Sequence, residues 1–220
     1  MPAKGSLGLE RAAGLIYPEA VNTPFRLCLI LTQKLCVRDP LDVLRAAMQG
    51  GIDCVQIREK NMSSAQLFEW GEILLPICRK NSVPLVINDC PEVAAALDAD
   101  GVHVGQDDMH PEDARKIVGP DKWVGVSTHN LEQADEAAEM GVQYAGFGPV
   151  FATPTKDVKE GLGPEFLAAA GAISRVPLVA IGGILPENAW MVRDRAAMAV
   201  SAGICAAKDP AAAAAEILGD

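Results

Sequence analysis

The sequence lacks any run of 18 consecutive apolar residues, and its basic residues are outnumbered by its acidic ones. A membrane-spanning helix needs about 20 mostly apolar residues, so the first absence excludes one. The 19 Lys and Arg against 29 Asp and Glu give a formal net charge of −10, whereas nucleic acid and anionic membranes attract basic protein surfaces. We therefore expect neither as a partner, and an anionic ligand would have to be met by a local cluster of cations.

Paired cysteines and a secretory signal are also missing. The six cysteines form no Cys-x-x-Cys pair, and no histidine stands near them at the spacing of a zinc site. We expect reduced and mostly buried thiols, because Cys28, Cys54 and Cys205 fall inside apolar runs. The first 25 residues contain no apolar core of a signal peptide, so a cytoplasmic location is the expectation.

Eight short runs rich in Val, Ile and Leu are present, each followed by a turn signal and an amphipathic segment. The runs are 26–32, 54–59, 84–89, 101–106, 123–128, 144–150, 177–183 and 198–204. Helix start signals stand between them, at Asp39-Pro40, Ser63, Pro91, Pro111, Asn130, Pro164, Pro186 and Asp209-Pro210. The chain therefore reads as a repeated strand and helix unit.

The runs are continuously hydrophobic, which is typical of parallel strands that are covered on both faces. Eight such units over residues 26–220 predict a single α/β domain, a (β/α)8 TIM barrel, preceded by an N-terminal extension over residues 1–25. A doubly wound open sheet is the alternative, although it would usually have five or six strands. In a barrel, the active site lies in the loops after the carboxyl ends of the strands.

Polar residues gather at this end of nearly every predicted strand. Asp89 and Asp108 offer carboxylate oxygens from neighbouring units, which is the sparse protein ligation that Mg²⁺ accepts beside phosphates and water. The cations at the same rim are Arg58, Lys60 and Lys156, and Ser127 adds a hydroxyl. A metal with three cations indicates a diphosphate ligand.

A second anion site is suggested by Gly182-Gly183 after the seventh run and by Val200-Ser201 in the eighth. Glycine lets backbone N–H groups approach a phosphate closely, and this fold often binds phosphate after strands 7 and 8. A glycine pair also suits a tight turn. The indication of a phosphate site therefore comes from the place of this pair after the seventh of the eight predicted strands.

With these residues in place, residues 26–218 resemble the thiamine phosphate synthase family of (β/α)8 enzymes. The stretches that carry the resemblance are VQIREK (55–60), INDCPEVAAALDADGVHVGQDD (87–108), VGVSTHN (124–130), FGPVFATPTK (147–156) and VPLVAIGGI (176–184). The resemblance implies a transferase that joins 4-amino-2-methyl-5-hydroxymethylpyrimidine diphosphate to hydroxyethyl-thiazole phosphate, or its carboxylated form. The products would be thiamine phosphate and pyrophosphate, with Mg²⁺ as the cofactor.

The resemblance also implies a role for each matching residue. The metal ligands would be Asp89 and Asp108. The pyrimidine diphosphate would be bound by Gln56, Arg58, Lys60, Asn88, Ser127 and Lys156, of which Arg58, Lys60, Ser127 and Lys156 would be catalytic. The thiazole phosphate would be bound by Thr153, Thr155, Gly183, Val200 and Ser201.

The sequence departs from the family pattern in two places within the barrel. Cys28 and Gln33 replace an aromatic and an acidic residue around the first strand, and Arg193 to Ala197 replace an Ala-Gly-Ala-Asp-Gly stretch before the last strand. The alternatives to a synthase are a thiazole tautomerase of the same superfamily and a non-catalytic sensor of thiamine or thiazole phosphates. A tautomerase would not need the metal and diphosphate cluster. No histidine base is predicted, and His103 is expected to pack in or near the barrel.

Overall fold

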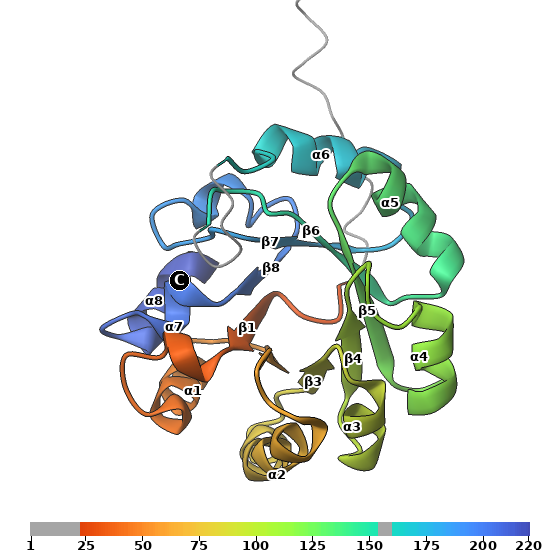
Figure 1. The fold of residues 1–220 in the computed structure, drawn as a ribbon. Coiled ribbons are helices and arrows are strands. Elements are labelled where there is room, and N and C mark those ends of the chain that lie inside the picture. The colour runs from red at the N-terminus through yellow and green to blue at the C-terminus, as the bar shows by residue number, and fades with distance from the viewer. Residues whose placement is uncertain (1–22, 154–159) are drawn as a thin grey trace, which may run out of the picture.

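The computed structural model describes residues 23–153 and 160–220, which form a closed barrel of eight parallel strands (Figure 1). Neighbours in sequence pair in order, and β8 closes the ring by pairing with β1. The strands are β1 (Leu27–Leu31), β2 (Cys54–Ile57), β3 (Leu85–Asn88), β4 (Gly101–Val104), β5 (Trp123–Thr128), β6 (Tyr144–Phe147), β7 (Leu178–Ile181) and β8 (Ala197–Val200). The predicted TIM barrel is confirmed, and the open sheet is wrong.

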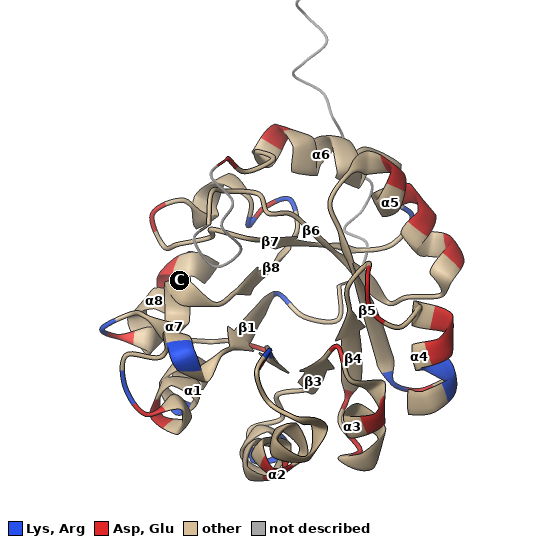
Figure 2. Cartoon of the chain, viewed as in Figure 1, with Lys and Arg blue, Asp and Glu red and all other residues tan. Residues whose placement is uncertain are grey.

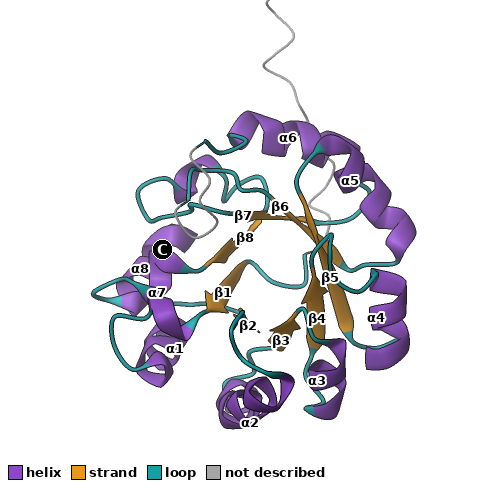
Figure 3. Ribbon diagram, in the orientation of Figure 1, coloured by secondary structure: helices purple, strands orange, loops and turns teal. Residues whose placement is uncertain are grey.

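Helices cover the outside of the ring (Figure 3). They are α1 (Pro40–Gln49), α2 (Ser64–Lys80), α3 (Pro91–Ala96), α4 (Pro111–Val118), α5 (Leu131–Glu136), α6 (Pro164–Ile173), α7 (Ala202–Cys205) and α8 (Pro210–Leu218), with 3-10 turns η1 (Gln33–Leu35), η2 (Ala137–Met140) and η4 (Ala189–Met191). Most start signals behave as predicted. Asp39 and Asp209 accept hydrogen bonds from N–H groups of the first turn, and Ser63 forms a capping box with Gln66.

Side chains alternate along each strand between the lumen of the barrel and the layer beneath the helices. Leu27, Leu29 and Leu31 of β1 belong to the large cluster under the helices, whereas Cys28 and Ile30 belong to the smaller cluster in the lumen. Because of the same alternation, a polar residue at the end of a strand lies in the lumen when its side chain is one of those that face inward. This alternation brings the polar ends of different strands together.

The lumen is closed at the amino ends of the strands by aromatic side chains. Phe25 is buried there, with its ring 5.2 Å from that of Tyr144 in an edge-on arrangement and 6.2 Å from that of Trp123. Edge-on aromatic pairs at these separations are favourable. The barrel therefore opens toward solvent mainly at the carboxyl ends of its strands.

Side-chain acceptors at the amino ends join successive strands in pairs. Asp53 accepts from the N–H of Leu27, Asp100 from that of Leu85, and Gln143 from that of Val124, at 2.7–2.8 Å. Each acceptor directly precedes an even-numbered strand and binds the first residues of the odd-numbered strand that comes before it in the chain. These contacts satisfy buried N–H groups that the ladder leaves unpaired.

Two sequence predictions fail in the last quarter of the chain. The run 198–204 was expected as one strand, but β8 ends at Val200 and α7 begins at Ala202. Pro186 was expected to start a helix, but the connection from β7 to β8 holds only the 3-10 turn η4. A short apolar run is equally compatible with a buried strand and a buried helix, which explains the first error.

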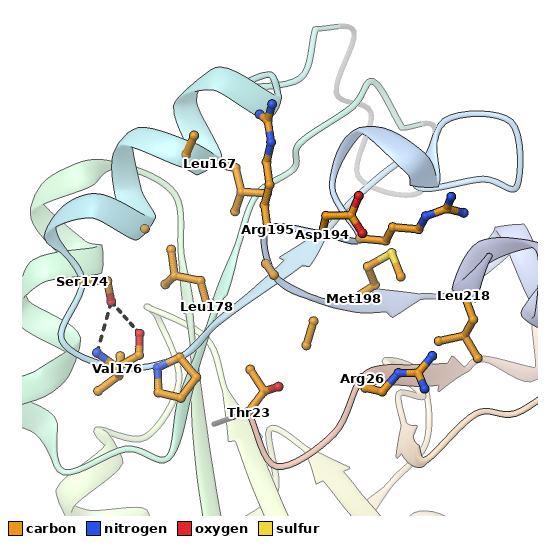
Figure 4. A pocket seen from close by; sticks show the side chains of 16 residues that line it. Thr23, Arg26, Leu167, Ser174, Val176, Leu178, Asp194, Arg195, Met198 and Leu218 are labelled. Atoms are coloured by element: carbon orange, nitrogen blue, oxygen red, sulfur yellow. Dashed lines mark hydrogen bonds between the residues drawn. The ribbon is translucent and has the colours of Figure 1, made fainter. Parts of the chain in front are cut away.

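A cavity of about 480 Å³ lies beside this short connection (Figure 4). Its lining includes Leu167 and Gly171 of α6, Leu218 of α8, and Arg193 and Arg195 before β8. The other units fill the corresponding space with a helix. The cavity is therefore a packing consequence of the missing helix, and it lies away from the carboxyl ends of the strands.

Replacing Gly171 by alanine should stabilise the protein. Gly171 is helical, and a Cβ atom added there would meet no atom within 4 Å. Alanine should therefore raise the free energy of unfolding by about 0.5 to 1 kcal/mol, the helix-propensity difference between the two residues. The midpoint of urea unfolding measures the change.

The matched control is Gly71→Ala in α2, where the added Cβ would overlap the Leu97 side chain. We expect that variant to lose the propensity gain to overpacking. An unfolding midpoint for Gly171→Ala at or below that of the unmodified protein would contradict the open space beside α6.

The surface and the thiols agree with the composition. Acidic residues are spread over the outer helices α3 to α6 (Figure 2). All six cysteines are free, and Cys28, Cys54, Cys78 and Cys205 are buried. In residues 23–153 and 160–220, no helix has the length and apolarity needed to cross a membrane.

Candidate active site

The carboxyl ends of the strands surround a cavity of about 260 Å³. Gln56 follows Cys54 on the inward phase of β2, and Asn88 follows Val86 in the same way on β3. Ser127 reaches the cavity from β5. The predicted site residues in its lining are Gln56, Arg58, Asn88, Ser127, Thr153, Gly183, Val200 and Ser201.

The predicted metal ligands lie beside this cavity. Asp89 follows β3 and is held by its backbone N–H, which donates to the carbonyl of His103 at 2.8 Å. Asp108 lies in the loop after β4, where its Oδ2 accepts from the N–H of Gly105 at 2.9 Å. The two carboxylates are within hydrogen-bonding reach of each other. The structure therefore places residues from two units at one point of the rim.

Like charges and partial burial make this pair unfavourable as two free carboxylates. Burial and the neighbouring Asp108 raise the pKa of Asp89 to about 6, while Lys60 and Arg58 act in the opposite direction. Lys60 is the nearer cation, with Nζ 4.0 Å from Oδ2 of Asp89. A divalent cation between the carboxylates would remove the repulsion, so the pair suits Mg²⁺ chemically.

The described residues contain no group of three or more side chains of the types that commonly bind metals. Two carboxylates alone are a weak site for a permanently bound metal, but Mg²⁺ commonly completes its coordination with water and substrate phosphates. The donor set therefore fits a metal that binds together with a phosphorylated ligand.

Arg58 is fixed by the ends of two strands. Its N–H donates to the carbonyl of Leu31 at 3.0 Å, and its carbonyl accepts from Oγ1 of Thr32 at 3.0 Å. Glu59 then accepts from the N–H of Gln33 at 2.6 Å, which ties the following loop to the end of β1. Held in this way, the Arg58 side chain lines the cavity beside the carboxylate pair.

The glycines after β7 form the opposite side of the cavity. Gly183 has a φ of +65°, and a Cβ atom there would overlap the carbonyl oxygen of Ala152. Within the described residues, no protein acceptor is found for the N–H groups of Gly183 and Ile184. Ser201 lies next to them and donates from Oγ to the carbonyl of Ile30 at 2.8 Å. Close backbone approach with available N–H groups is suited to an anion.

Two predicted residues, Thr155 and Lys156, lie outside the described residues. Thr153, the last described residue before them, is buried and lines the cavity. The roles predicted for Thr155 and Lys156 stay predictions from the sequence.

Two histidines line the cavity that sequence reasoning did not assign to the site. His103 is buried on β4, as expected, but its Nε2 is also 2.9 Å from Oγ of Ser127. His129 has Nδ1 2.6 Å from the carbonyl oxygen of Gly148. The inward phase of β4 is the sequence signal for His103, since it stands two residues after Gly101 and at the same register as Asn88.

Comparisons with known proteins identify the family of this chain. Residues 27–204 match the family model for thiamine monophosphate synthase, TMP-TENI. The thiamine-phosphate synthase of Chlorobium luteolum is 40% identical over 203 residues, covering 90% of this chain and 94% of that protein. The thiamine-phosphate synthase of Syntrophomonas wolfei is 42% identical over 179 residues, covering 80% of this chain and 86% of that protein.

A solved structure, the thiamine phosphate pyrophosphorylase of Pyrococcus furiosus, superimposes with a TM-score of 0.79 at 33% identity. The match covers 88% of this chain and 93% of that one. Residues 27–204, which match the family model, include every strand of the barrel and the loops that surround the cavity. This chain therefore belongs to the thiamine monophosphate synthase family.

Proposed function

We propose that the protein condenses the pyrimidine diphosphate with the thiazole phosphate to form thiamine phosphate and pyrophosphate, with Mg²⁺ as cofactor. The observation that carries the proposal is the arrangement of the cavity. A carboxylate pair with Lys60 and Arg58 stands on one side, and the glycine loop after β7 stands on the other. Two small phosphorylated substrates can thus be held at the same time, one at each side.

Asp89 and Asp108 would hold the metal. When bound, Mg²⁺ supplies positive charge to the oxygens of the diphosphate and so makes pyrophosphate a better leaving group. Arg58 and Lys60 add fixed cations to the same group, and Ser127 offers a hydroxyl. Lys156 is proposed for the same task from its place in the sequence. These charges act on the group where negative charge develops.

The bond that breaks joins the methylene carbon of the pyrimidine to the bridging oxygen of the diphosphate, and its electron pair leaves with pyrophosphate. The amino-substituted ring releases electrons into that carbon and stabilises the cation. The thiazole nitrogen then donates its lone pair and forms the new C–N bond. The step needs neither a protein nucleophile nor a strong general base, so orientation and charge are what the site must supply.

The thiazole phosphate would be anchored by the loops after β6, β7 and β8. Gly183 brings its backbone close to the phosphate, while Thr153 and Ser201 line the cavity from the neighbouring loops. Val200 gives the cavity an apolar wall. Anchoring at the phosphate leaves the thiazole ring free to face the pyrimidine.

The test is product formation. Purified protein mixed with both substrates and Mg²⁺ should form thiamine phosphate and pyrophosphate in equal amounts, measured by liquid chromatography and a pyrophosphate assay. Leaving out either substrate, or chelating the metal with EDTA, should stop both. If folded protein isomerises a thiazole phosphate or only binds it, and forms no thiamine phosphate, the tautomerase or the sensor is the correct assignment.

A further inference from the structure

Four strands contribute to a chain of polar side chains beneath the cavity, and three of them are neighbours. His103 of β4, Gly125 of β5 and Tyr144 of β6 are successive partners in register across the sheet. Gly125 has no side chain, and a Cβ atom there would overlap the Tyr144 ring. The Tyr144 ring therefore crosses β5 through the space that Gly125 leaves open, and it reaches His103.

The contacts along this chain are short. Nδ1 of His103 is 3.2 Å from the Tyr144 hydroxyl, and Nε2 is 2.9 Å from Oγ of Ser127. From β2, the Gln56 side chain lies within hydrogen-bonding reach of the same tyrosine hydroxyl. His103, Tyr144 and Gln56 are each at most 6% exposed. The chain thus runs from Gln56 through Tyr144 and His103 to Ser127, and both of its ends line the cavity.

With a neutral imidazole, these contacts have two self-consistent directions. In one direction Ser127 donates to His103, His103 donates to Tyr144, and Tyr144 donates to the carbonyl of Gln56. In the other, every donor and acceptor is exchanged. His103 then donates from Nε2 to Ser127, Tyr144 donates to Nδ1, and the Gln56 amide donates to the Tyr144 oxygen.

The direction decides what each end presents to a ligand. Only in the second direction does Ser127 keep its O–H proton for an anion in the cavity. The same direction turns the carbonyl oxygen of Gln56 away from Tyr144, where it is available to an N–H donor. An anion at one end of the chain is thus coupled to an acceptor at the other, which matches a substrate that carries both a diphosphate and a ring amino group.

We propose that Tyr144 and His103 are positioning residues that couple the two ends of the chain, so that Ser127 donates to the diphosphate in the same arrangement in which Gln56 accepts from the pyrimidine amine. The inference rests on the proposed function. Neither Tyr144 nor His103 has to exchange a proton with the substrate. Their effect is that a substrate that sets the hydrogen bond at one end of the chain also sets the one at the other end.

Tyr144→Phe tests the inference, because it removes the hydroxyl and keeps the ring. We expect kcat/KM for the pyrimidine diphosphate to fall about tenfold, the effect of one lost hydrogen bond, with an unchanged KM for the thiazole phosphate. The matched control is Thr128→Val, which removes another buried hydroxyl between β5 and β6, bonded to the Gly146 carbonyl. Both variants should lose similar stability in urea unfolding, but Thr128→Val should keep its kcat/KM.

A double-mutant cycle with Ser127→Ala separates positioning from simple loss of stability. If Tyr144 acts through Ser127, its tenfold effect should shrink to about twofold in the Ser127→Ala background, because only the Gln56 end remains. Equal effects in both backgrounds, or an equal loss of activity in Thr128→Val, would overturn the inference. The proposed function is judged separately, by whether the unmodified protein forms thiamine phosphate.

Discussion

Replacing Asp89 by asparagine should lower the rate of thiamine phosphate formation at least about a thousandfold at saturating substrates and Mg²⁺. The change removes one of two carboxylate ligands and leaves Arg58 and Lys60 without the metal beside the leaving group, a loss of several kcal/mol in the transition state. Asparagine is a better replacement than alanine because Asp89 has a φ of +63°. Asparagine tolerates that conformation more readily than alanine, so the barrel should stay folded.

The measurement is the rate as a function of Mg²⁺ concentration, with unfolding in urea as a check of the fold. Asp107→Asn is the matched control, since Asp107 is exposed beside Asp108 and has no part in the proposed site. That variant should retain its rate within about twofold, as surface changes usually do. A fully active Asp89→Asn at ordinary Mg²⁺ concentrations would rule out the carboxylate pair as the metal site.

Replacing Gly183 by alanine should raise the KM for the thiazole phosphate about a hundredfold, because displacing an anchoring loop by an ångström can have an effect of that size. The new methyl group would overlap the Ala152 carbonyl oxygen and lie 2.8 Å from Cβ of Phe151. The loops after β6 and β7 would have to separate, which moves the N–H groups of Gly183 and Ile184. The KM for the pyrimidine diphosphate should change much less.

Gly141→Ala is the matched control for backbone conformation. Gly141 also has a φ of +65°, but an added Cβ would meet no atom within 4 Å, and the residue ends η2 away from the cavity. Both variants lose about 1 to 2 kcal/mol of stability to the left-handed conformation. If both raise the KM for the thiazole phosphate equally, loop displacement is not the cause.

The sequence predicted the barrel because its strands are continuously apolar and its helices begin at clear capping residues such as Asp39 and Ser63. It also predicted the residues that line the cavity, since parallel strands end at one rim. It failed after Val200, where Ala202 and Ile204 are as apolar in a buried helix as they would be in a strand. It failed at Pro186 because proline suits the first residue of a turn as well as of a helix.

The contact between Tyr144 and His103 could not be predicted in the same way. It depends on the register of three strands and on the space above Gly125, and no local pattern carries that information. Sequence reasoning therefore treated His103 as a packing residue. The sequence predicted the strands on which His103 and Tyr144 lie, but it did not predict that their side chains meet.

The side-chain acceptors at the amino ends of the strands make the ring unequal around its circumference. Asp53, Asp100 and Gln143 cross-link β1 to β2, β3 to β4 and β5 to β6 at their amino ends, and of the four pairs that begin with an odd-numbered strand only β7 and β8 lack such a link. The corresponding position before β8 is Ala196, which has no side-chain acceptor. Among these four pairs, β7 and β8 are thus the two strands whose transient separation costs least, and their amides should exchange with solvent before those of the three clamped pairs.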